Sequence, residues 1–547
     1  MKKTLMFLTA TIFAALGAFA GEAPQTVTLP MLENEGWWGG LYDGALKVMP
    51  YGLRTPNAVM DLRDGIRHQV SAPILVSDKG RWVWSDQAFC MTITNGTMIL
   101  QPTTTPIQHG RAGTTLREAF RYASQKFMPT QGKMPDRAFF DLPQYNTWIE
   151  LNYNQNQKAV LEYAANMRKW GFPPGIIMID DTWQFDYGVW RFDPTVFPAP
   201  KEMVDTLHKD GYKVMLWMIQ YVSPDTREFR HLKGHRALVR TSGLGFEIDP
   251  SPAIFEWWDG LSAGLDFTSP YACKWFVEQL ERLQKEYNID GFKFDGTSPR
   301  WYDCPGKRVA AKKDASSGDL SEAYGDICAK FPFNECKAWK GGGKPVVARL
   351  NDKPHSWKAV QSLIPEMIAA GLEGYQFVCP DMIGGGQLWS FTHGASEIKY
   401  KMLKPEIYIR SAQVQALCPM MQFSLGPWHI LNETEMAALK KALAIRQKFA
   451  DKGFFTKLAE EAAKTGEPML RSLEYVFPGK GYAMIVDQFL MGDTLLVAPQ
   501  VNPGALERDV VIPPGKWLGD DGKIVVGPAT IKVETPIDRI PHFVLQK

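Results

Sequence analysis

The stretch 288–296 carries the residues of this chain that are best suited to chemistry. A short apolar run ends in Lys293-Phe294-Asp295, which predicts a buried strand of a parallel barrel with Asp295 at its carboxyl end. Lys293 lies two residues before Asp295 and therefore on the same side of the strand, where its ammonium group favours the ionised form of Asp295. An ionised carboxylate in a cleft acts as a nucleophile or a base. The alternative is a turn residue or a helix cap.

A second carboxylate follows a later strand-like run. Residues 346–350 are mostly apolar and include Arg349, and a loop with Asp352 follows at once. Two carboxylates about 5 to 5.5 Å apart, one ionised and one with a raised pKa, are the machinery of a retaining glycosidase. Arg349 would hold Asp295 ionised or bind a sugar hydroxyl, which leaves Asp352 as the proton carrier. A surface loop with a charge cluster is the alternative.

From about residue 143 the chain alternates between strand-like and helical runs. The predicted strands are 146–151, 174–181, 212–217 and 288–296, and the predicted helices are 157–169, 202–209 and 271–287. This alternation implies parallel strands with crossover helices, and the polar or Trp residues at the strand ends favour a closed (β/α)8 TIM barrel. No glycine-rich dinucleotide fingerprint follows these strands, which argues against an open doubly wound sheet.

The barrel, predicted over 143–430, has β-rich flanks. Residues 21–142 contain short runs rich in Val, Ile, Thr and Trp between turn residues, which predicts an N-terminal β-sandwich. Residues 431–547 begin with one helical run and continue with strand-like runs, which predicts a C-terminal β domain. The stretch at about 300–344 is rich in Gly, Lys and Cys and is predicted to be a loop inserted over the barrel mouth.

The first twenty residues have the pattern of a secretory signal peptide. Two lysines precede an apolar run, and residues 18–20 have the A-x-A pattern of a cleavage site. We therefore expect export, to the periplasm or the medium, with a mature chain that begins at Gly21. The apolar run is shorter than the ~20 residues of a spanning helix, and no other stretch is long and charge-free enough, so no membrane span is expected.

Composition and charge narrow the function classes. A chain of 547 residues exceeds one hydrophobic core, so several domains are expected. The formal net charge is +2 and no basic stripe stands out, so no nucleic-acid partner is expected. The seven cysteines lack the spacing of a metal site, and neither a metal nor a cofactor is expected. An exported chain would be free to oxidise a pair among Cys304, Cys328 and Cys336.

Several motifs resemble, in order and spacing, those of glycoside hydrolase family 31. They are Ile179-Asp180-Asp181, Phe192-Asp193-Pro194, Asp266-Phe267-Thr268, Lys293-Phe294-Asp295, Asp352, Asp381-Met382-Ile383-Gly384 and Gly492-Asp493-Thr494. The resemblance implies that Asp295 is the nucleophile and Asp352 the acid/base. It also implies that Asp180, with Asp181 beside it, binds distal hydroxyls of the sugar. The remaining residues implied to line this subsite are Trp148, Trp217, Lys293 and Arg349, of which the two tryptophans would pack on the sugar or, alternatively, fill the barrel core.

Three departures separate this chain from the typical α-glucosidases of that family. Those enzymes have Trp-x-Asp at the nucleophile, Asp-x-Asp on the second strand and a late Arg-Asn-His. This chain has Lys293-Phe294-Asp295, Asp180-Asp181 and a late Met421-Gln422-Phe423-Ser424, in which Ser424 would replace a sugar-contacting His. The set resembles the branch that contains bacterial α-galactosidases and the animal myogenesis-regulating glycosidase.

The resemblance therefore implies a retaining, exo-acting α-galactosidase whose substrate is an α-linked oligosaccharide or glycoconjugate with a terminal galactose. Other activities of the same family are the first alternative: α-glucosidase, α-xylosidase or α-N-acetylgalactosaminidase. A non-catalytic carbohydrate-binding barrel is the second, and the presence of both Asp295 and Asp352 argues against it.

Overall fold

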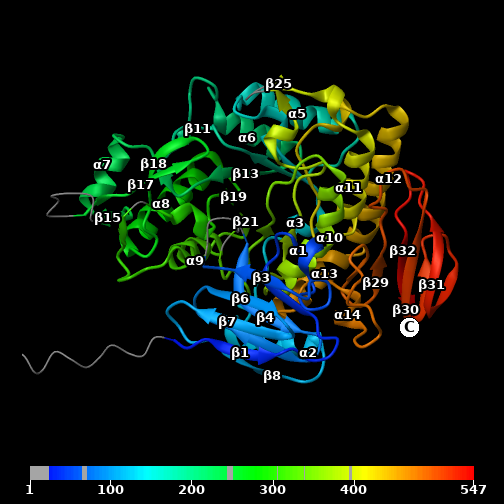
Figure 1. The fold of residues 1–547 in the computed structure, drawn as a ribbon. Helices are drawn as coiled ribbons and strands as arrows, with labels where there is room; N and C mark the ends of the chain where they lie inside the picture. The colour runs from blue at the N-terminus through cyan, green and yellow to red at the C-terminus, as the bar shows by residue number, and fades with distance from the viewer. Residues whose placement is uncertain are drawn as a thin grey trace, which may run out of the picture.

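The computed structural model describes residues 24–63, 70–242, 250–304, 306–337, 339–393 and 397–546. The signal peptide predicted at 1–20 therefore lies outside the described residues. In Figure 1 the N-terminal strands (blue) lie below a central barrel, and the C-terminal sheet (red) lies at its right side. Among the described residues, no helix combines the length and the apolar character that a membrane crossing requires.

Eight short parallel strands form the barrel. In chain order they are β9 (Gln144–Asn146), β10 (Ile176–Ile179), β13 (Lys213–Met218), β19 (Gly291–Phe294), β21 (Phe333–Glu335), β22 (Ala348–Arg349), β23 (Val378–Cys379) and β26 (Gln422–Phe423). One sheet has the order β21-β19-β13-β10-β9-β26, and a second pairs β22 with β23. A parallel bridge between Cys336 and Ala348 joins one edge of the two sheets. A second, between Met382 and Gln422, closes the ring and confirms the predicted (β/α)8 barrel.

Helices cover the outside of the ring. They are α5 (Gln157–Lys169), α6 (Pro200–Lys209), α8 (Pro270–Tyr287), α9 (Ser317–Cys328), α10 (Trp357–Leu372), α11 (Pro405–Ala416) and α12 (Glu433–Ala450). Several begin at a residue whose side chain accepts a first-turn N–H group, as Asn156 does for α5 and Ser356 for α10. With helices outside and side chains inside, the four apolar residues of β10 are all buried.

Parts of the barrel interior are polar. Gln422 Nε2 donates to Gln144 Oε1 at 2.9 Å and to Glu335 Oε2 at 2.7 Å, across three strands. These side chains are fully buried, and the two bonds satisfy part of their hydrogen-bonding capacity, whereas Gln422 Oε1 and Gln144 Nε2 have no hydrogen-bond partner. Because β21 contributes the polar Glu335 to this network, the strand has no apolar run that a sequence pattern would reveal.

Two predicted boundaries differ from the structure. The stretch at about 300–344, predicted as an inserted loop, contains helix α9 and the barrel strand β21, so much of it belongs to the barrel. The prediction failed there because β21 has only three residues, of which Asn334 and Glu335 are polar. Helix α12 packs on α11 as the last helix of the ring, so the barrel extends past residue 430 to about 450.

The predicted N-terminal sandwich consists of two four-stranded antiparallel sheets. Their orders are β1-β7-β6-β3 and β2-β4-β5-β8. The strands are β1 (Val27–Pro30), β2 (Trp37–Leu41), β3 (Ala58–Asp61), β4 (Ser71–Ser77), β5 (Arg81–Trp84), β6 (Phe89–Thr94), β7 (Thr97–Pro102) and β8 (Gln108–Arg111). Helix α2 (Leu116–Phe127) packs on β4 and β5.

The sandwich contacts the barrel where the ring lacks a helix. The described residues of the connection between β21 and β22 contain no helix, and the Lys340 N–H group donates to the Ser71 carbonyl at 3.1 Å. Nearby, the Asn351 N–H group donates to the Tyr42 hydroxyl at 2.8 Å. The sandwich therefore supports the loop that carries Asp352.

The C-terminal part is a six-stranded antiparallel sheet in the order β27-β28-β29-β32-β30-β31. The strands are β27 (Leu470–Arg471), β28 (Phe489–Met491), β29 (Leu495–Val497), β30 (Glu507–Gly519), β31 (Ile524–Glu534) and β32 (His542–Gln546), and α13 (Phe454–Thr465) leads into them. Arg410 Nη2 and Gln413 Nε2 of α11 donate to backbone carbonyls at Thr535 and Ile537, at 2.7 and 2.6 Å. These bonds hold the sheet against the barrel, and the predicted three-part fold is confirmed.

A buried arginine on α12 ties the end of the barrel together. Arg446 is 2% exposed and donates to the carbonyl oxygens of Ala416, Cys418, Pro419 and Phe140 at 2.7 to 3.3 Å. Burial lowers the pKa of Arg446 to about 10. Replacing the guanidinium by an apolar group would leave four carbonyl acceptors without this donor.

We therefore expect Arg446→Met to lower the free energy of unfolding by about 3 to 5 kcal/mol, since it removes a buried charged group from a bonded network. Urea denaturation followed by circular dichroism measures the change. Lys448→Met alters an exposed residue of the same helix and is expected to change the free energy by less than about 0.5 kcal/mol. Equal losses in the two variants would contradict the role given to Arg446.

Candidate active site

Asp295 directly follows β19, at the carboxyl end of the barrel. Its N–H group donates to the Met218 carbonyl at 2.8 Å, which extends the pairing of β13 with β19 by one residue. The carboxylate accepts the Gly296 N–H group at 2.9 Å on Oδ1 and Trp217 Nε1 at 3.1 Å on Oδ2. Its side chain is 15% exposed. The carboxylate is thus oriented by two donors and still reaches solvent.

A lysine that the sequence patterns did not reveal lies between the two predicted catalytic carboxylates. Lys337 Nζ is 3.5 Å from Asp295 Oδ1 and 3.8 Å from Asp352 Oδ1. The two oxygens are therefore no further apart than the sum of these distances. The largest possible separation of the two oxygens therefore lies in the lower part of the range of about 6.5 to 9.5 Å that separates the carboxyl groups of inverting glycosidases. The structure brings Asp295 and Asp352 together, as predicted.

The position of Lys337 depends on strand β21. Its side chain is 7% exposed, and its N–H group donates to Thr297 Oγ1 at 2.8 Å. Lys337 comes two residues after the end of β21, at the barrel mouth. Because β21 has no apolar run, nothing in the sequence marked its carboxyl end. The signal that could have located Lys337 is the alternation itself, which requires a fifth barrel strand between β19 and β22.

The surroundings of Asp295 keep it ionised. Burial opposes ionisation, but the ammonium groups of Lys337 and Lys293 outweigh burial and hold the pKa of Asp295 below its usual value. The negative charge of Asp352 acts in the opposite direction and is the weaker influence. An ionised Asp295 at neutral pH is what a nucleophile requires.

Asp352 differs from its prediction. Its side chain is 38% exposed, forms an ion pair with Arg349 and faces Lys337. Burial raises the pKa of Asp352, but Lys337 and Arg349 outweigh burial and hold that pKa well below its usual value. The expected raised pKa is therefore wrong for the unliganded protein. The physical reason is that Lys337 faces Asp352 as well as Asp295, and that Arg349 pairs with Asp352 and not with Asp295.

Arg349 gathers two further acidic groups below the Asp352 loop. It is 1% exposed, its Nη2 donates to Asp381 Oδ1 at 2.7 Å, and its Nε lies 3.6 Å from Glu335 Oε1. Asp381 Oδ2 accepts the N–H groups of Lys353 and Gly386 at 2.7 and 3.1 Å. Burial raises the pKa of Asp381 to about 6. Fully buried and satisfied by backbone groups, Asp381 acts as a turn acceptor.

Lys293 pairs with Asp180. The distance from Lys293 Nζ to Asp180 Oδ2 is 2.6 Å, and the two side chains are 6% and 3% exposed. Burial works to lower the pKa of Lys293, but Asp180 and Asp295 outweigh it and raise that pKa. Lys293 therefore stays charged, holding Asp180 by a direct bond and Asp295 through space.

Asp181 has a different environment from Asp180. It is 1% exposed, and its Oδ1 accepts the Thr182 N–H group at 2.7 Å and Gln184 Nε2 at 3.2 Å. Burial, with Asp259 beside it, raises the pKa of Asp181 well above its usual value. Tyr187 also contacts this carboxylate. The sequence patterns missed Asp259 and Tyr187 because these two residues lie in hairpins outside the barrel strands.

The two predicted tryptophans differ in exposure. Strand β9 ends at Asn146, so Trp148 lies on the short helix α4 (Trp148–Leu151) and not on the strand predicted at 146–151. Trp148 is half-buried and its Nε1 donates at 3.0 Å to the carbonyl of Gly386, a residue beside Asp352. Trp217 is 1% exposed and gives its N–H group to Asp295. Trp217 therefore positions the carboxylate, and Trp148 has surface to offer a ligand.

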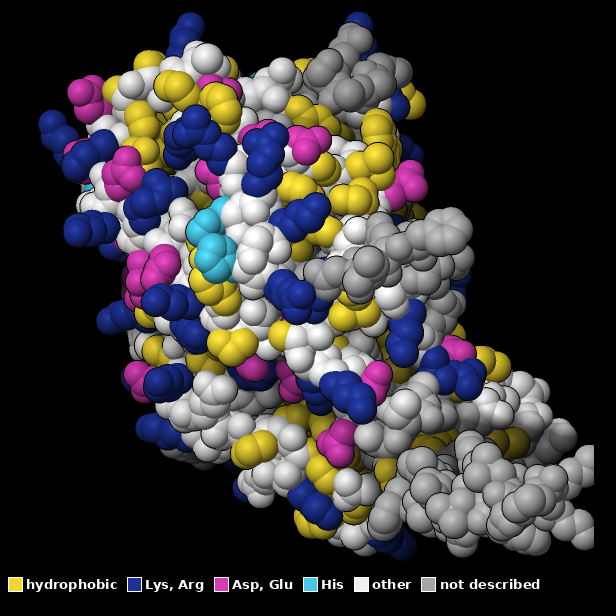
Figure 2. Space-filling view, turned by 90° about the vertical axis from the view of Figure 1, so that its left-hand side faces the viewer, with side chains coloured by type: hydrophobic (Ala, Val, Ile, Leu, Met, Phe, Trp, Pro, Cys, Tyr) yellow, Lys and Arg dark blue, Asp and Glu magenta, His cyan; other side chains and the backbone are white. Residues whose placement is uncertain are grey.

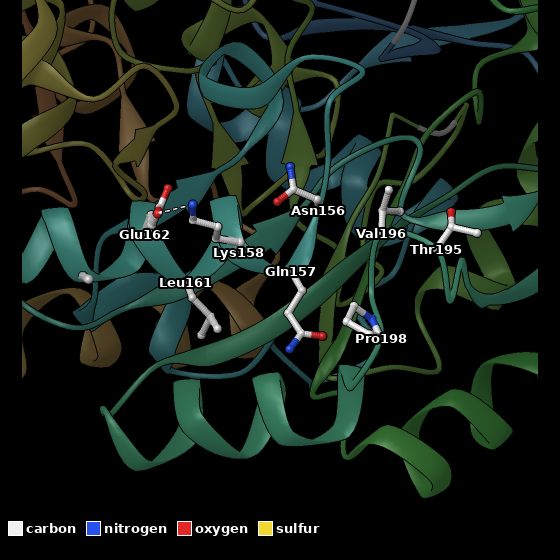
Figure 3. Close-up of a pocket in the computed structure, with 9 residues that line it drawn as sticks. Asn156, Gln157, Lys158, Leu161, Glu162, Thr195, Val196 and Pro198 are labelled. Atoms are coloured by element: carbon white, nitrogen blue, oxygen red, sulfur yellow. Dashed lines mark ion pairs between the residues drawn. The ribbon is translucent and has the colours of Figure 1, made fainter.

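A separate hollow of about 780 Å³ lies on the outside of the barrel, between α5 and residues 195–198 (Figure 3). Its carboxylate, Glu162, forms an exposed ion pair with Lys158 at 3.7 Å. None of the predicted site residues lines it. The chemistry belongs to the barrel mouth, where buried charges converge.

Among the described residues, no three His, Cys, Asp or Glu side chains are grouped so as to hold a metal ion. Cys304, Cys328 and Cys336, the predicted candidates for oxidation, are free thiols. On the face in Figure 2, Lys and Arg side chains are scattered among acidic and apolar ones.

Two family models match the chain. Residues 133–451 match the TIM-barrel domain of glycosyl hydrolases family 31, and residues 466–546 match the C-terminal domain of the same family. The chain belongs to glycoside hydrolase family 31. The first match extends beyond residue 430 and includes α12, in agreement with the packing of that helix.

Relatives within family 31 cover most of this chain. It is 31% identical over 435 residues to myogenesis-regulating glycosidase of Mus musculus, covering 78% of this chain and 59% of that protein. It is 23% identical over 449 residues to 1,3-alpha-isomaltosidase of Kribbella flavida, covering 73% and 60%. The chain thus spans about three fifths of these two proteins. The structure of a GH31 alpha-xylosidase from a soil metagenome, complexed with xylose, aligns with TM-score 0.78 at 20% identity over 95% of this chain and 79% of that one.

Ser424 is one of the departures of this family 31 member from the usual α-glucosidase motif. Its Oγ accepts the Ile149 N–H group at 2.7 Å, and it is fully buried. The Ser424 hydroxyl therefore binds the backbone of α4 at Ile149.

Lys337→Met is expected to raise the pKa of Asp295, because it removes the strongest influence that lowers this pKa. Since the nucleophile must be ionised, the acidic limb of kcat/KM should move to higher pH, by about one unit or more. The pH profile on any glycoside that the chain hydrolyses measures the shift.

Lys344→Met is the control for this variant, since Lys344 lies in the same connection but pairs with Asp326 on α9 at 2.6 Å. Its profile should match that of the wild type. An unmoved acidic limb in Lys337→Met would refute the electrostatic role of Lys337.

Proposed function

We propose that this protein is a retaining, exo-acting α-glycoside hydrolase whose substrate carries a terminal α-galactose. The observation that carries the proposal is the pair of Asp295 and Asp352, held at the barrel mouth around the single ammonium group of Lys337. Such proximity supports a nucleophile and an acid/base on one glycosidic bond. Membership of family 31 supports the same class of reaction.

The reaction would proceed by two displacements. Asp295 attacks the anomeric carbon and forms a covalent glycosyl ester, while Asp352 protonates the departing oxygen. Water then attacks the same carbon, gives its proton to Asp352 and releases Asp295. The Trp217 and Gly296 N–H groups keep the Asp295 carboxylate aimed throughout. Two inversions retain the anomeric configuration.

Asp352 must gain a proton before it acts as an acid. In the unliganded protein, Lys337 and Arg349 stabilise its charged form. Of the acidic groups around Asp295, Asp352 is more exposed than the buried Asp180 and Asp381, and it lies on a loop. Rotation of this side chain away from Arg349 toward the leaving oxygen would remove one of the influences that lower its pKa. Substrate binding would thereby be coupled to protonation.

The preference for galactose rests on the motif set and on Lys293. Its ammonium group binds Asp180 and so occupies the position where the family's α-glucosidases have an uncharged Trp. An axial and an equatorial O4 would then meet different acceptors. Myogenesis-regulating glycosidase, the relative with 31% identity, has a name that specifies no sugar. We also propose export to the periplasm or the medium, on the basis of the pattern at 1–20.

A panel of 4-nitrophenyl α-glycosides tests the substrate class. We expect kcat/KM for the α-galactoside to exceed that for the α-glucoside, α-xyloside and α-N-acetylgalactosaminide by about tenfold or more. Proton NMR should show α-galactose as the first product. Preference for the glucoside would refute the galactose assignment, and no turnover of any member would leave a carbohydrate-binding barrel.

Asp295→Ala tests the nucleophile. We expect kcat to fall by about a thousandfold or more, because the glycosyl ester can no longer form. Added azide should restore turnover and yield a β-galactosyl azide. The control is Asp205→Ala, which removes an exposed carboxylate paired with Lys201 on α6 and should leave kcat unchanged. Activity near that of the wild type in Asp295→Ala would exclude this residue as nucleophile.

A further inference from the structure

A hairpin that is not part of the barrel reaches the site from the connection after β13. Strands β17 (Ile254–Trp257) and β18 (Gly260–Gly264) pair with β14 (Tyr221–Val222) in a three-stranded sheet. Figure 1 shows β17 and β18 to the left of β13 and β19. The ring of Tyr221 packs on Trp257, with centroids 4.9 Å apart. The two-residue turn of this hairpin is Trp258-Asp259.

The turn meets a second hairpin above Asp181. Strands β11 (Gln184–Asp186) and β12 (Val189–Phe192) carry Tyr187 in their connection. The Tyr187 hydroxyl lies 3.0 Å from Asp259 Oδ2 and 3.2 Å from Asp181 Oδ1. Its ring packs on Trp257 at 4.7 Å, and the Ser223 N–H group donates to the Tyr187 carbonyl at 2.9 Å. Asp181 and Asp259 are thus brought together by rigidly packed elements.

The single hydroxyl hydrogen of Tyr187 limits how the two carboxylates of this cluster are satisfied. The Tyr187 hydroxyl has one hydrogen, and so it satisfies only one of the two carboxylates at a time. In contrast to Asp180, which pairs with Lys293, Asp181 has no cation in contact among the described residues. Burial and the neighbouring Asp259 carboxylate raise the pKa of Asp181, which favours its protonated form. The pair therefore offers both a donor and an acceptor.

A second, independent observation indicates a missing partner at this place. Gln184 is 6% exposed and donates through Nε2 to Asp181 Oδ1 at 3.2 Å. Its amide oxygen is buried without a hydrogen-bond partner. Because both amide atoms share one carbon, this unmatched acceptor lies next to the same carboxylate. A buried acceptor without a donor is costly, and a polar ligand or a water bound to one would relieve the cost.

The cluster lies on the side of the nucleophile that faces away from the acid/base. Asp295 Oδ1 faces Lys337 and, beyond it, Asp352. Asp295 Oδ2 faces Trp217, whose ring packs on Tyr187 with centroids 6.2 Å apart. A leaving group beside Asp352 would therefore extend away from Asp259, and the terminal sugar would extend toward it.

We propose that Asp259 is a specificity-determining residue, which forms with Asp181 a carboxyl pair that binds one hydroxyl of the terminal sugar. This inference rests on the proposed function, because it assumes a sugar beside Asp295. A hydroxyl both donates and accepts, and a pair with one protonated member matches it in both directions. The hairpin then forms one wall of the subsite, on the side of Asp295 that faces away from Asp352.

Calorimetric binding of monosaccharides to the full chain tests this role without requiring turnover. The probes are galactose and its 2-, 3-, 4- and 6-deoxy analogues, each titrated into the wild type and into Asp259→Ala. We expect Asp259→Ala to weaken galactose binding by about 10- to 100-fold, the effect of one hydrogen bond to a charged group. For one analogue, the one that lacks the bound hydroxyl, the two proteins should bind equally.

Glu256→Ala provides the matched control, because Glu256 is an exposed residue of β17 in the same hairpin. It should bind every sugar as the wild type does. Equal losses for all analogues in Asp259→Ala would mean that Asp259 only supports the hairpin, and no loss would mean that it contacts no sugar. Either result overturns the proposal.

The same titrations separate this proposal from the proposed function. If the wild type binds glucose or xylose in place of galactose, the galactose assignment fails, and the deoxy analogues of the sugar that binds test Asp259 in the same way. If the wild type binds no monosaccharide, the specificity role is refuted whatever the turnover assays give.

Discussion

Charge compensation at the barrel mouth is the constraint on which the site depends. Five acidic side chains converge there with three buried cations, and an unpaired buried charge costs several kcal/mol. Lys337 compensates Asp295 and Asp352 together, while Lys293 serves Asp180 and Arg349 serves the acidic groups below the Asp352 loop. Asp181 lies outside this scheme and instead has a raised pKa. The cations thus hold the pKa values of Asp295 and Asp352 low, whereas burial outweighs Arg349 at Asp381 and raises its pKa.

The cations around Asp352 also define the state of the site before a substrate binds. With Arg349 and Lys337 beside it, Asp352 is held in its ionised form and has no proton to donate. Its loop has no regular secondary structure, whereas Asp295 follows a strand and is held by two donors. The proposed nucleophile is therefore preorganised, and the proposed proton donor requires a rearrangement. Such an asymmetry prevents the pair from titrating as two equivalent groups.

Much of this was readable from the sequence, because strand ends with an apolar run are visible. Asp295 and Asp180 follow such runs, and the alternation of strands and helices predicted the barrel. Lys337 was missed because β21 has three residues, of which Asn334 and Glu335 are polar. Asp259 and Tyr187 were missed because hairpins outside the ring are placed by tertiary packing. The ionisation of Asp352 depends on which carboxylate Arg349 binds, and no local pattern encodes that choice.

The contacts of the N-terminal sandwich bear on how this chain can be recombined. Its Tyr42 hydroxyl accepts the N–H group next to Asp352, and its Ser71 carbonyl holds the connection that follows Lys337. These are the two segments that supply the proton carrier and its counter-ion. A barrel that begins at residue 133 would lose the contacts that Tyr42 and Ser71 make with these two segments. The sandwich thus belongs to the unit that forms the site. Exchanging it between relatives would also exchange the contacts that hold the Asp352 loop and the connection after Lys337.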